Sequence, residues 1–131
     1  MALYGPVALP TQLAAGATLT TVICTIEAQD GSGVGAGRVE LTPPAGFATV
    51  TGVATNNATF NFRQLRNGAP LATFASITLN AGTNLVAETA LLVPITAVVS
   101  MQQNDVIDVQ QVQNGTGLAV GAGVLVEAVI N

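Results

Sequence analysis

Residues 58–79 read ATFNFRQLRNGAPLATFASITL, and this stretch decides the fold class. Polar and apolar side chains alternate on both sides of Asn67-Gly68, and a period of two places Phe60 and Phe62 on one face of a strand. Asn-Gly between two alternating runs is the strongest short-range signal for a β-hairpin. The stretch therefore predicts two antiparallel strands, 58–66 and 71–79, whose apolar faces line a core.

The same alternation recurs along the rest of the chain. Between turns rich in Gly, Pro and Asn, it predicts further strands at 19–29, 38–42, 47–54, 85–100, 105–113 and 118–130. About eight strands at spacings of roughly a dozen residues are typical of a sandwich or jelly roll. We expect an all-β fold, an antiparallel jelly-roll sandwich of about eight strands, over residues 18–131. Residues 1–17 have no clear period, and we expect an extended N-terminal arm there.

The composition argues against an enzyme. The chain of 131 residues has no His, no Lys and no Trp, and it holds one Cys, three Arg and seven carboxylates. Enzymes move protons or bind metals mainly through His, Lys, Cys or clustered carboxylates. Asp105 and Asp108 form the one close carboxylate pair within a predicted strand, and residues three apart point to opposite faces. We therefore expect no catalytic residue, no metal site and no cofactor.

The low charge also limits the partners. Net charge is −4 and charged residues make up 8% of the chain. Three scattered arginines cannot neutralise a phosphate track, so nucleic acid is disfavoured, and an anionic membrane is disfavoured for the same reason. The N-terminus has no basic segment followed by an apolar one, so we expect synthesis in a cytoplasm without standard export.

A mean hydropathy of +0.58 without a membrane span requires an explanation. Lysine usually protects exposed sheet edges, and this chain has none. In the last predicted strand, Val124, Val126, Ala128 and Ile130 share one face, while Leu125 and Val129 flank Glu127 on the other. Apolar residues on both faces predict that the second face is also covered, for example by a sister subunit. Leu125 and Val129 are therefore candidate subunit-interface residues.

The arginines and aspartates have alternative interpretations. Arg63 and Arg66 lie near the Asn67-Gly68 turn, where they could anchor an interface by bidentate pairing or simply keep the surface soluble. Asp105 is interpreted as a turn residue and Asp108 as a solvated or interface group.

Carbohydrate binding is disfavoured by the aromatic residues. There is no Trp, Tyr4 falls in the predicted arm, and the four Phe are interpreted as core. A site made of amide side chains stays open, although turn and interface positions explain the same residues. The candidate amides are Asn56, Asn57, Gln110, Gln111 and Gln113.

Two stretches carry a resemblance to a known family. Residues 53–64 (VATNNATFNFRQ) and 105–118 (DVIDVQQVQNGTGL) resemble segments of small jelly-roll proteins of tailed bacteriophages. Over residues 18–131 the chain looks like the capsid decoration, or cement, proteins with a trimeric, tumour-necrosis-factor-like jelly roll.

The resemblance implies a non-enzymatic structural protein of the virion, made in the host cytoplasm. Such proteins are homotrimers that bind the major capsid protein on the outer surface of the phage head, at three-fold or quasi-three-fold positions, and stabilise the shell. Their N-terminal arms often reach across the capsid or a sister subunit. From the composition of residues 1–17 we expect the capsid-binding anchors to be Leu3, Tyr4, Pro6, Val7, Leu9 and Pro10. The alternative is a receptor- or glycan-binding jelly-roll tip of a phage tail or head fibre.

Overall fold

The computed structural model describes residues 2–9, 18–27, 36–118, 120 and 123–130. Every regular element in this part of the chain is a β-strand, and every strand pairing is antiparallel. The all-β, antiparallel prediction is therefore confirmed. The strands are β1 (Ala2–Ala8), β2 (Leu19–Thr25), β3 (Ala36–Thr42), β4 (Val50–Thr51), β5 (Asn57–Arg66), β6 (Ala69–Leu79), β7 (Asn84–Leu85), β8 (Leu91–Leu92), β9 (Val106–Asn114) and β10 (Leu125–Ile130).

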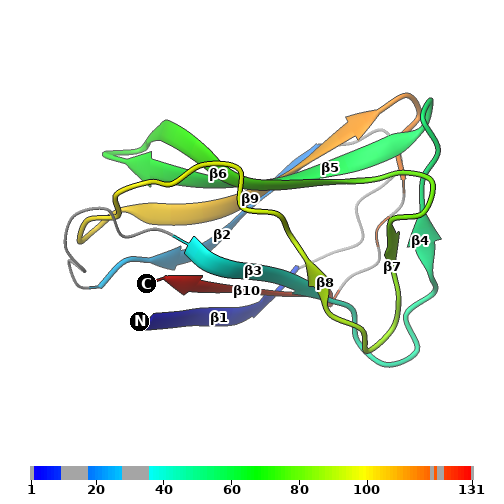
Figure 1. Ribbon diagram of the computed structural model, residues 1–131, viewed down its shortest axis with the longest axis horizontal. Helices are drawn as coiled ribbons and strands as arrows, with labels where there is room; N and C mark the ends of the chain where they lie inside the picture. The colour runs from blue at the N-terminus through cyan, green and yellow to red at the C-terminus, as the bar shows by residue number, and fades with distance from the viewer. Residues whose placement is uncertain (1, 10–17, 28–35, 119, 121–122, 131) are drawn as a thin grey trace.

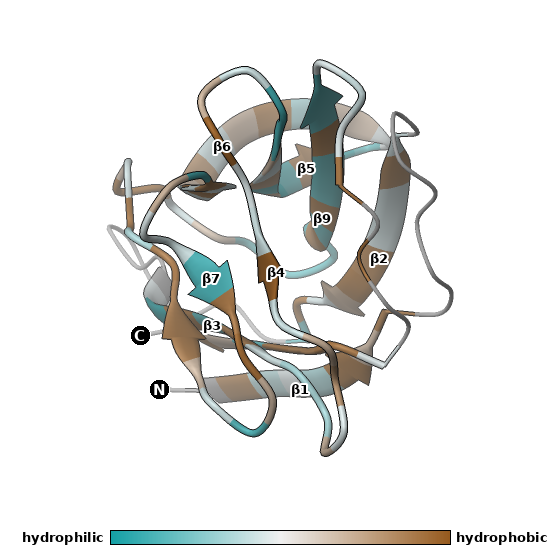
Figure 2. Cartoon of the chain, turned by 90° about the vertical axis from the view of Figure 1, so that its right-hand side faces the viewer, coloured by the Kyte–Doolittle hydropathy of each residue, from teal (hydrophilic) through white to brown (hydrophobic). Residues whose placement is uncertain are grey.

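The strands form two four-stranded sheets and one short ladder. One sheet has the order β1-β10-β3-β8, the other has the order β2-β9-β5-β6, and β4 pairs with β7. Figure 1 shows the two sheets as separate layers, with β4 and β7 at one end. Figure 2 looks from that end into the space that the two layers enclose. The pairings are nested along the chain, because β1 pairs with β10, β2 with β9, β3 with β8 and β5 with β6.

The core lies between the two sheets, as the alternation predicts. Phe60, Phe62 and Phe74 are fully buried. From the other sheet, β3 contributes two inward side chains and the β10 region contributes four, all at most 1% exposed. These inward residues are Val39, Leu41, Val124, Val126, Ala128 and Ile130.

The hairpin predicted at Asn67-Gly68 is present. Arg66 pairs with Ala69 across the turn, and both turn residues have positive φ, 53° at Asn67 and 78° at Gly68. Positive φ at both central positions defines the two-residue turn that favours Asn-Gly. The hairpin therefore joins β5 and β6 without a longer loop.

Two predicted strands are largely absent. Within 47–54, the strand residues are Val50–Thr51. Within 85–100, the strand residues are Leu85 and Leu91–Leu92. Pro94 has no N–H to give to a ladder. The chain around it instead borders β6, where Ser76 N–H donates to the Pro94 carbonyl and Thr96 N–H donates to the Phe74 carbonyl. This segment covers the edge of β6 that would otherwise be open.

The predicted N-terminal arm is wrong over residues 2–9. These residues belong to the sandwich as β1, an edge strand that pairs with β10 from Ala2↔Ile130 to Ala8↔Leu125. The register shifts between Tyr4 and Val7, around Gly5 and Pro6, and this irregularity hides the alternation from a sequence pattern. Residues 10–17 of the predicted arm lie outside the described residues.

Candidate functional site

Five of the six predicted capsid anchors lie in the described residues, where they fall into three groups by exposure. Leu9 is 2% exposed and belongs to the core, held by hydrogen bonds from Leu9 N–H to the Val124 carbonyl (2.9 Å) and from Gly123 N–H to the Leu9 carbonyl (3.0 Å). Tyr4 and Val7 are half-buried against the core, and Leu3 and Pro6 are exposed. The sixth, Pro10, lies outside the described residues. The anchor prediction is therefore wrong for Leu9, whose side chain is not available to a partner.

Arg63 forms a bidentate ion pair within the sheet. Its Nε and Nη2 atoms donate to the two carboxylate oxygens of Asp108, at 2.9 and 2.8 Å. The residues are direct cross-strand partners on β5 and β9, so their side chains leave the same face. The Asp108 side chain is only 4% exposed, which makes the predicted solvated or interface role of Asp108 wrong.

Arg66 forms the second bidentate pair, at the end of the same two strands. Its Nε and Nη2 donate to Asp105 at 2.8 and 2.9 Å. The Asp105 carboxylate also accepts hydrogen bonds from Gln64 Nε2 (2.8 Å) and from the backbone N–H of Gln102 (2.9 Å). The Arg66 hydrogen bond is the main cause that lowers the pKa of Asp105 from 3.8 to about 2, opposed by burial.

Both arginines therefore form ion pairs with carboxylates of the same chain. Neither sequence interpretation of these arginines anticipated this role. Both ion pairs follow the register between β5 and β9. Arg63 pairs with Asp108 and Leu65 with Val106, and the next position along each chain segment brings Arg66 opposite Asp105. A spacing of three residues on each strand puts the pairs on opposite faces of the sheet. The two ion pairs link β5 to β9 and stabilise the turn before β9.

The outer face of the β1-β10-β3-β8 sheet carries exposed apolar side chains. Leu3, Leu92 and Leu125 are 59, 60 and 37% exposed. Val129 is half-buried and lies directly opposite Leu3, while Leu125 lies opposite Ala8. We call Leu3, Leu92, Leu125 and Val129 the apolar outer face. The predicted interface residues Leu125 and Val129 are thus accessible on one face of the isolated chain.

This face carries few charged side chains, and its negative charges outnumber its positive charges. Arg38 Nε lies 2.9 Å from Glu40 Oε1, and the Arg38 side chain is 57% exposed. Glu127 lies directly across from Glu40 on the neighbouring strand. Like charges in directly opposed positions are unfavourable within a sheet. Glu127 makes no ion pair with any described residue.

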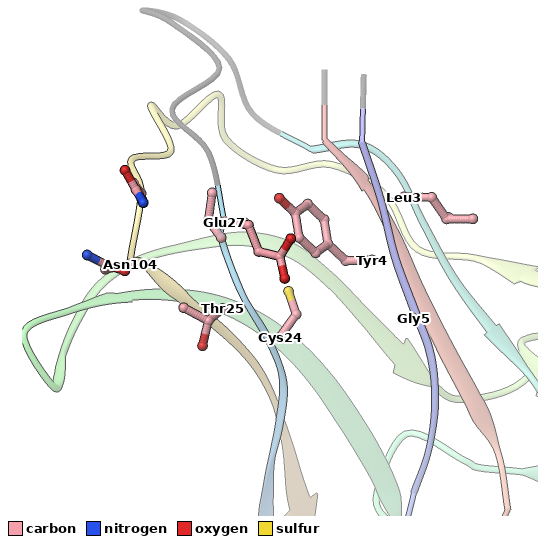
Figure 3. A pocket seen from close by; sticks show the side chains of 9 residues that line it. Leu3, Tyr4, Gly5, Cys24, Thr25, Glu27 and Asn104 are labelled. Atoms are coloured by element: carbon pink, nitrogen blue, oxygen red, sulfur yellow. The ribbon is translucent and has the colours of Figure 1, made fainter.

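A cavity of about 590 Å³ lies where β1 begins and β2 ends. Tyr4, Cys24 and Glu27 contribute to its lining. Figure 3 shows the Tyr4 ring, the Glu27 carboxylate and the Cys24 thiol grouped at the cavity, while Leu3 and Asn104 point away. Burial raises the pKa of the Cys24 thiol to about 11, so this thiol stays protonated and is a poor nucleophile at neutral pH. Sequence reasoning missed the cavity, because it placed Tyr4 outside the sandwich.

The amides considered for a carbohydrate site do not all share one face, although Asn56, Asn57 and Gln113 are neighbours in the strand register. Asn57 is buried and its Nδ2 donates to the carbonyls of Val53 and Ala54, both at 3.1 Å. Asn56 accepts a hydrogen bond from Thr116 at 3.0 Å. Gln111 is 1% exposed on the inner side of β9, whereas Gln110 is half-buried on its outer side. Turn chemistry therefore accounts for Asn56 and Asn57.

No family model, curated protein or solved structure matches this chain. Within the described residues, no group of three or more His, Cys, Asp or Glu side chains is placed to hold a metal ion. In the same part of the chain, no helix is long and apolar enough to span a membrane.

Proposed function

We propose that this protein is a non-enzymatic capsid decoration, or cement, protein of a tailed bacteriophage. In this proposal it assembles as a homotrimer and binds the major capsid protein on the outer surface of the head, at three-fold or quasi-three-fold positions. It is made in the host cytoplasm and resides in the virion, where it stabilises the shell.

The strand order supports a jelly roll as the finer description of the fold. A jelly roll holds eight strands in two sheets and is built from two Greek keys. The nested pairs β1–β10, β2–β9, β3–β8 and β5–β6 correspond to one long antiparallel hairpin wrapped around a core. In this description β4 and β7 are an accessory ladder beside the eight strands.

The apolar outer face is the observation that carries the proposal. It places three leucines, all more than one third exposed, on one sheet of a chain that has no lysine. Fully burying a leucine side chain stabilises by about 1.5–3 kcal/mol, so covering this face contributes substantially to association. Exposed apolar side chains grouped on one face favour protein-protein contact, and here Glu127 lies between Leu125 and Val129 along β10, while Glu40 lies between Leu92 and β10. We assign the face to contact between subunits, with Leu125 and Val129 as predicted.

Trimer formation also explains how modest contacts could stabilise a shell. Three equivalent patches on one trimer raise the effective concentration for the second and third contacts. A protein that binds the assembled shell but not its loosened form stabilises the shell by linkage. Among the described anchor candidates, Pro6 is exposed and lies outside the apolar outer face, so it remains for such contacts.

The direct test uses heads of the phage that encodes the chain, prepared without this protein. Purified protein should co-sediment with expanded heads at three copies per occupied position and should raise the temperature at which the heads release DNA. Protein that leaves both the sedimentation and the release temperature of the heads unchanged would remove the proposal. A control with Val98→Lys, which alters an 83% exposed residue outside the strands of both sheets, should behave like the unmodified chain.

A further inference from the structure

We propose that the cavity between Tyr4 and Glu27 binds a cationic side chain, lysine or arginine, supplied by a partner protein. The cavity volume of about 590 Å³ falls in the range of sites that hold small ligands, so one long side chain fits within it. The cation binding itself is independent of the proposed function. Only the identity of the donor, as the capsid protein, rests on that function.

The lining selects a cation by its charge and its aromatic ring. Glu27 is an exposed carboxylate that makes no ion pair with a described residue. The Tyr4 ring lies beside it in the view of Figure 3 and is held half-buried against the core. An aromatic ring attracts a cation placed over its face, and a carboxylate accepts hydrogen bonds from ammonium or guanidinium groups. Together they provide two attractions for one cation, and the Glu27 carboxylate repels an anion.

The rest of the lining suits the stem of a long basic side chain. The half-buried Cys24, whose thiol stays protonated, lines the same cavity. Lysine and arginine bury their methylene stems along apolar surface and keep the charged head near polar groups. A small inorganic cation lacks such a stem and would not use this part of the cavity.

This chain does not supply the cation from its described residues. Its three basic side chains are arginines, and each is paired with a carboxylate elsewhere: Arg38 with Glu40, Arg63 with Asp108, and Arg66 with Asp105. The sequence contains no lysine. Because no basic side chain of the described residues is left for the cavity, we assign the cation to a partner protein.

The composition provides a selective probe for the test. Tyr4 is the single tyrosine and there is no tryptophan, so tyrosine emission reports on this cavity alone. We expect n-butylammonium and methylguanidinium to change this emission at millimolar concentrations, beyond the effect of sodium at equal ionic strength. Butanol and butyrate, which have the stem but not the positive charge, should leave the emission unchanged.

Variants separate this site from a general charge effect. Glu27→Gln should weaken cation binding by at least about threefold, the scale of an exposed ion pair. Glu88→Gln removes an exposed carboxylate that does not line the cavity and should bind like the unmodified chain. Equal weakening by both variants, or no response to either cation beyond sodium, would overturn the proposal. A response to methyl glucoside in place of the cations would overturn it as well, in favour of a saccharide site.

Discussion

At the scale of single residues, the Arg66–Asp105 cluster has the most side-chain hydrogen bonds among the described residues. Asp105 accepts from Arg66, Gln64 and the backbone of Gln102, and Gln64 also donates to the Ser100 carbonyl at 2.8 Å. The cluster joins the end of β5 to the segment before β9. It therefore fixes the end of the sandwich next to the Tyr4–Glu27 cavity.

Asp105→Asn should lower the free energy of unfolding by about 2 kcal/mol, because the variant places an amide donor where four N–H donors from three residues converge on Asp105. Urea denaturation monitored by circular dichroism measures the change. The exposed Glu88→Gln serves as the control, and we expect its effect to stay within about 0.5 kcal/mol. Equal stability of the two variants would show that the cluster contributes little.

The same residue makes stability depend on pH. The pKa of Asp105 is lowered from 3.8 to about 2 in the folded chain. A carboxyl with a lowered folded pKa contributes stability that is present above its unfolded pKa and is lost as pH falls through the folded pKa. The free energy of unfolding should therefore fall between about pH 4 and pH 2, and the fall should be smaller in Asp105→Asn. Parallel pH profiles of the two proteins would contradict this assignment.

A glycine is required at position 115 because two turns approach each other closely there. It has a φ of +74°, and a Cβ at this position would overlap the Thr55 carbonyl oxygen. Gly82 has a similar φ of +87°, but a Cβ there would meet no atom within 4 Å. Gly115→Ala should therefore lower the melting temperature well below that of Gly82→Ala, since both carry the backbone strain but only one carries the overlap. Equal melting temperatures would refute the close approach.

At the scale of elements, the proposed self-association depends on the outer face of β10. Leu125→Lys should weaken self-association without unfolding the chain, because its side chain is already 37% exposed. Val98→Lys, at an 83% exposed position outside both sheets, should leave self-association unchanged. Sedimentation velocity of both variants gives the comparison. Identical association of the two variants would exclude Leu125 from the interface.

Local patterns predicted the elements that follow a strict alternation. The strands on both sides of Asn67-Gly68 and the inward residues of β10 were predicted within a few residues of their observed positions. The alternation failed where the register shifts. In β2 a shift between Val22 and Cys24 leaves Val22 63% exposed, although the alternation places it on the face of Cys24 and Ile26.

Long-range pairing explains the site residues that the sequence did not reveal. Arg63 and Asp108 are 45 residues apart, so their contact depends on the register between β5 and β9, which no local pattern determines. The cavity was missed for a related reason. Tyr4 and Glu27 come together only because β1 joins the sheet, and the irregularity at Gly5 and Pro6 concealed that strand.

At the scale of the whole molecule, charge and apolar surface point to assembly. Internal ion pairs use all three arginines, so the net charge of −4 comes from the remaining carboxylates. Over the part of the chain that the structure describes, a surface whose arginines are all paired and that has exposed leucines on one sheet favours association over long-lived monomers. The proposed capsid role and the proposed trimer both depend on this tendency to associate.

Sedimentation equilibrium of the purified chain tests the central claim most directly. The account predicts a mass three times that of the 13.1 kDa chain, together with slowed hydrogen exchange along β10 relative to a Leu125→Lys variant. A single 13.1 kDa species at every concentration, with β10 exchanging alike in both proteins, would contradict it.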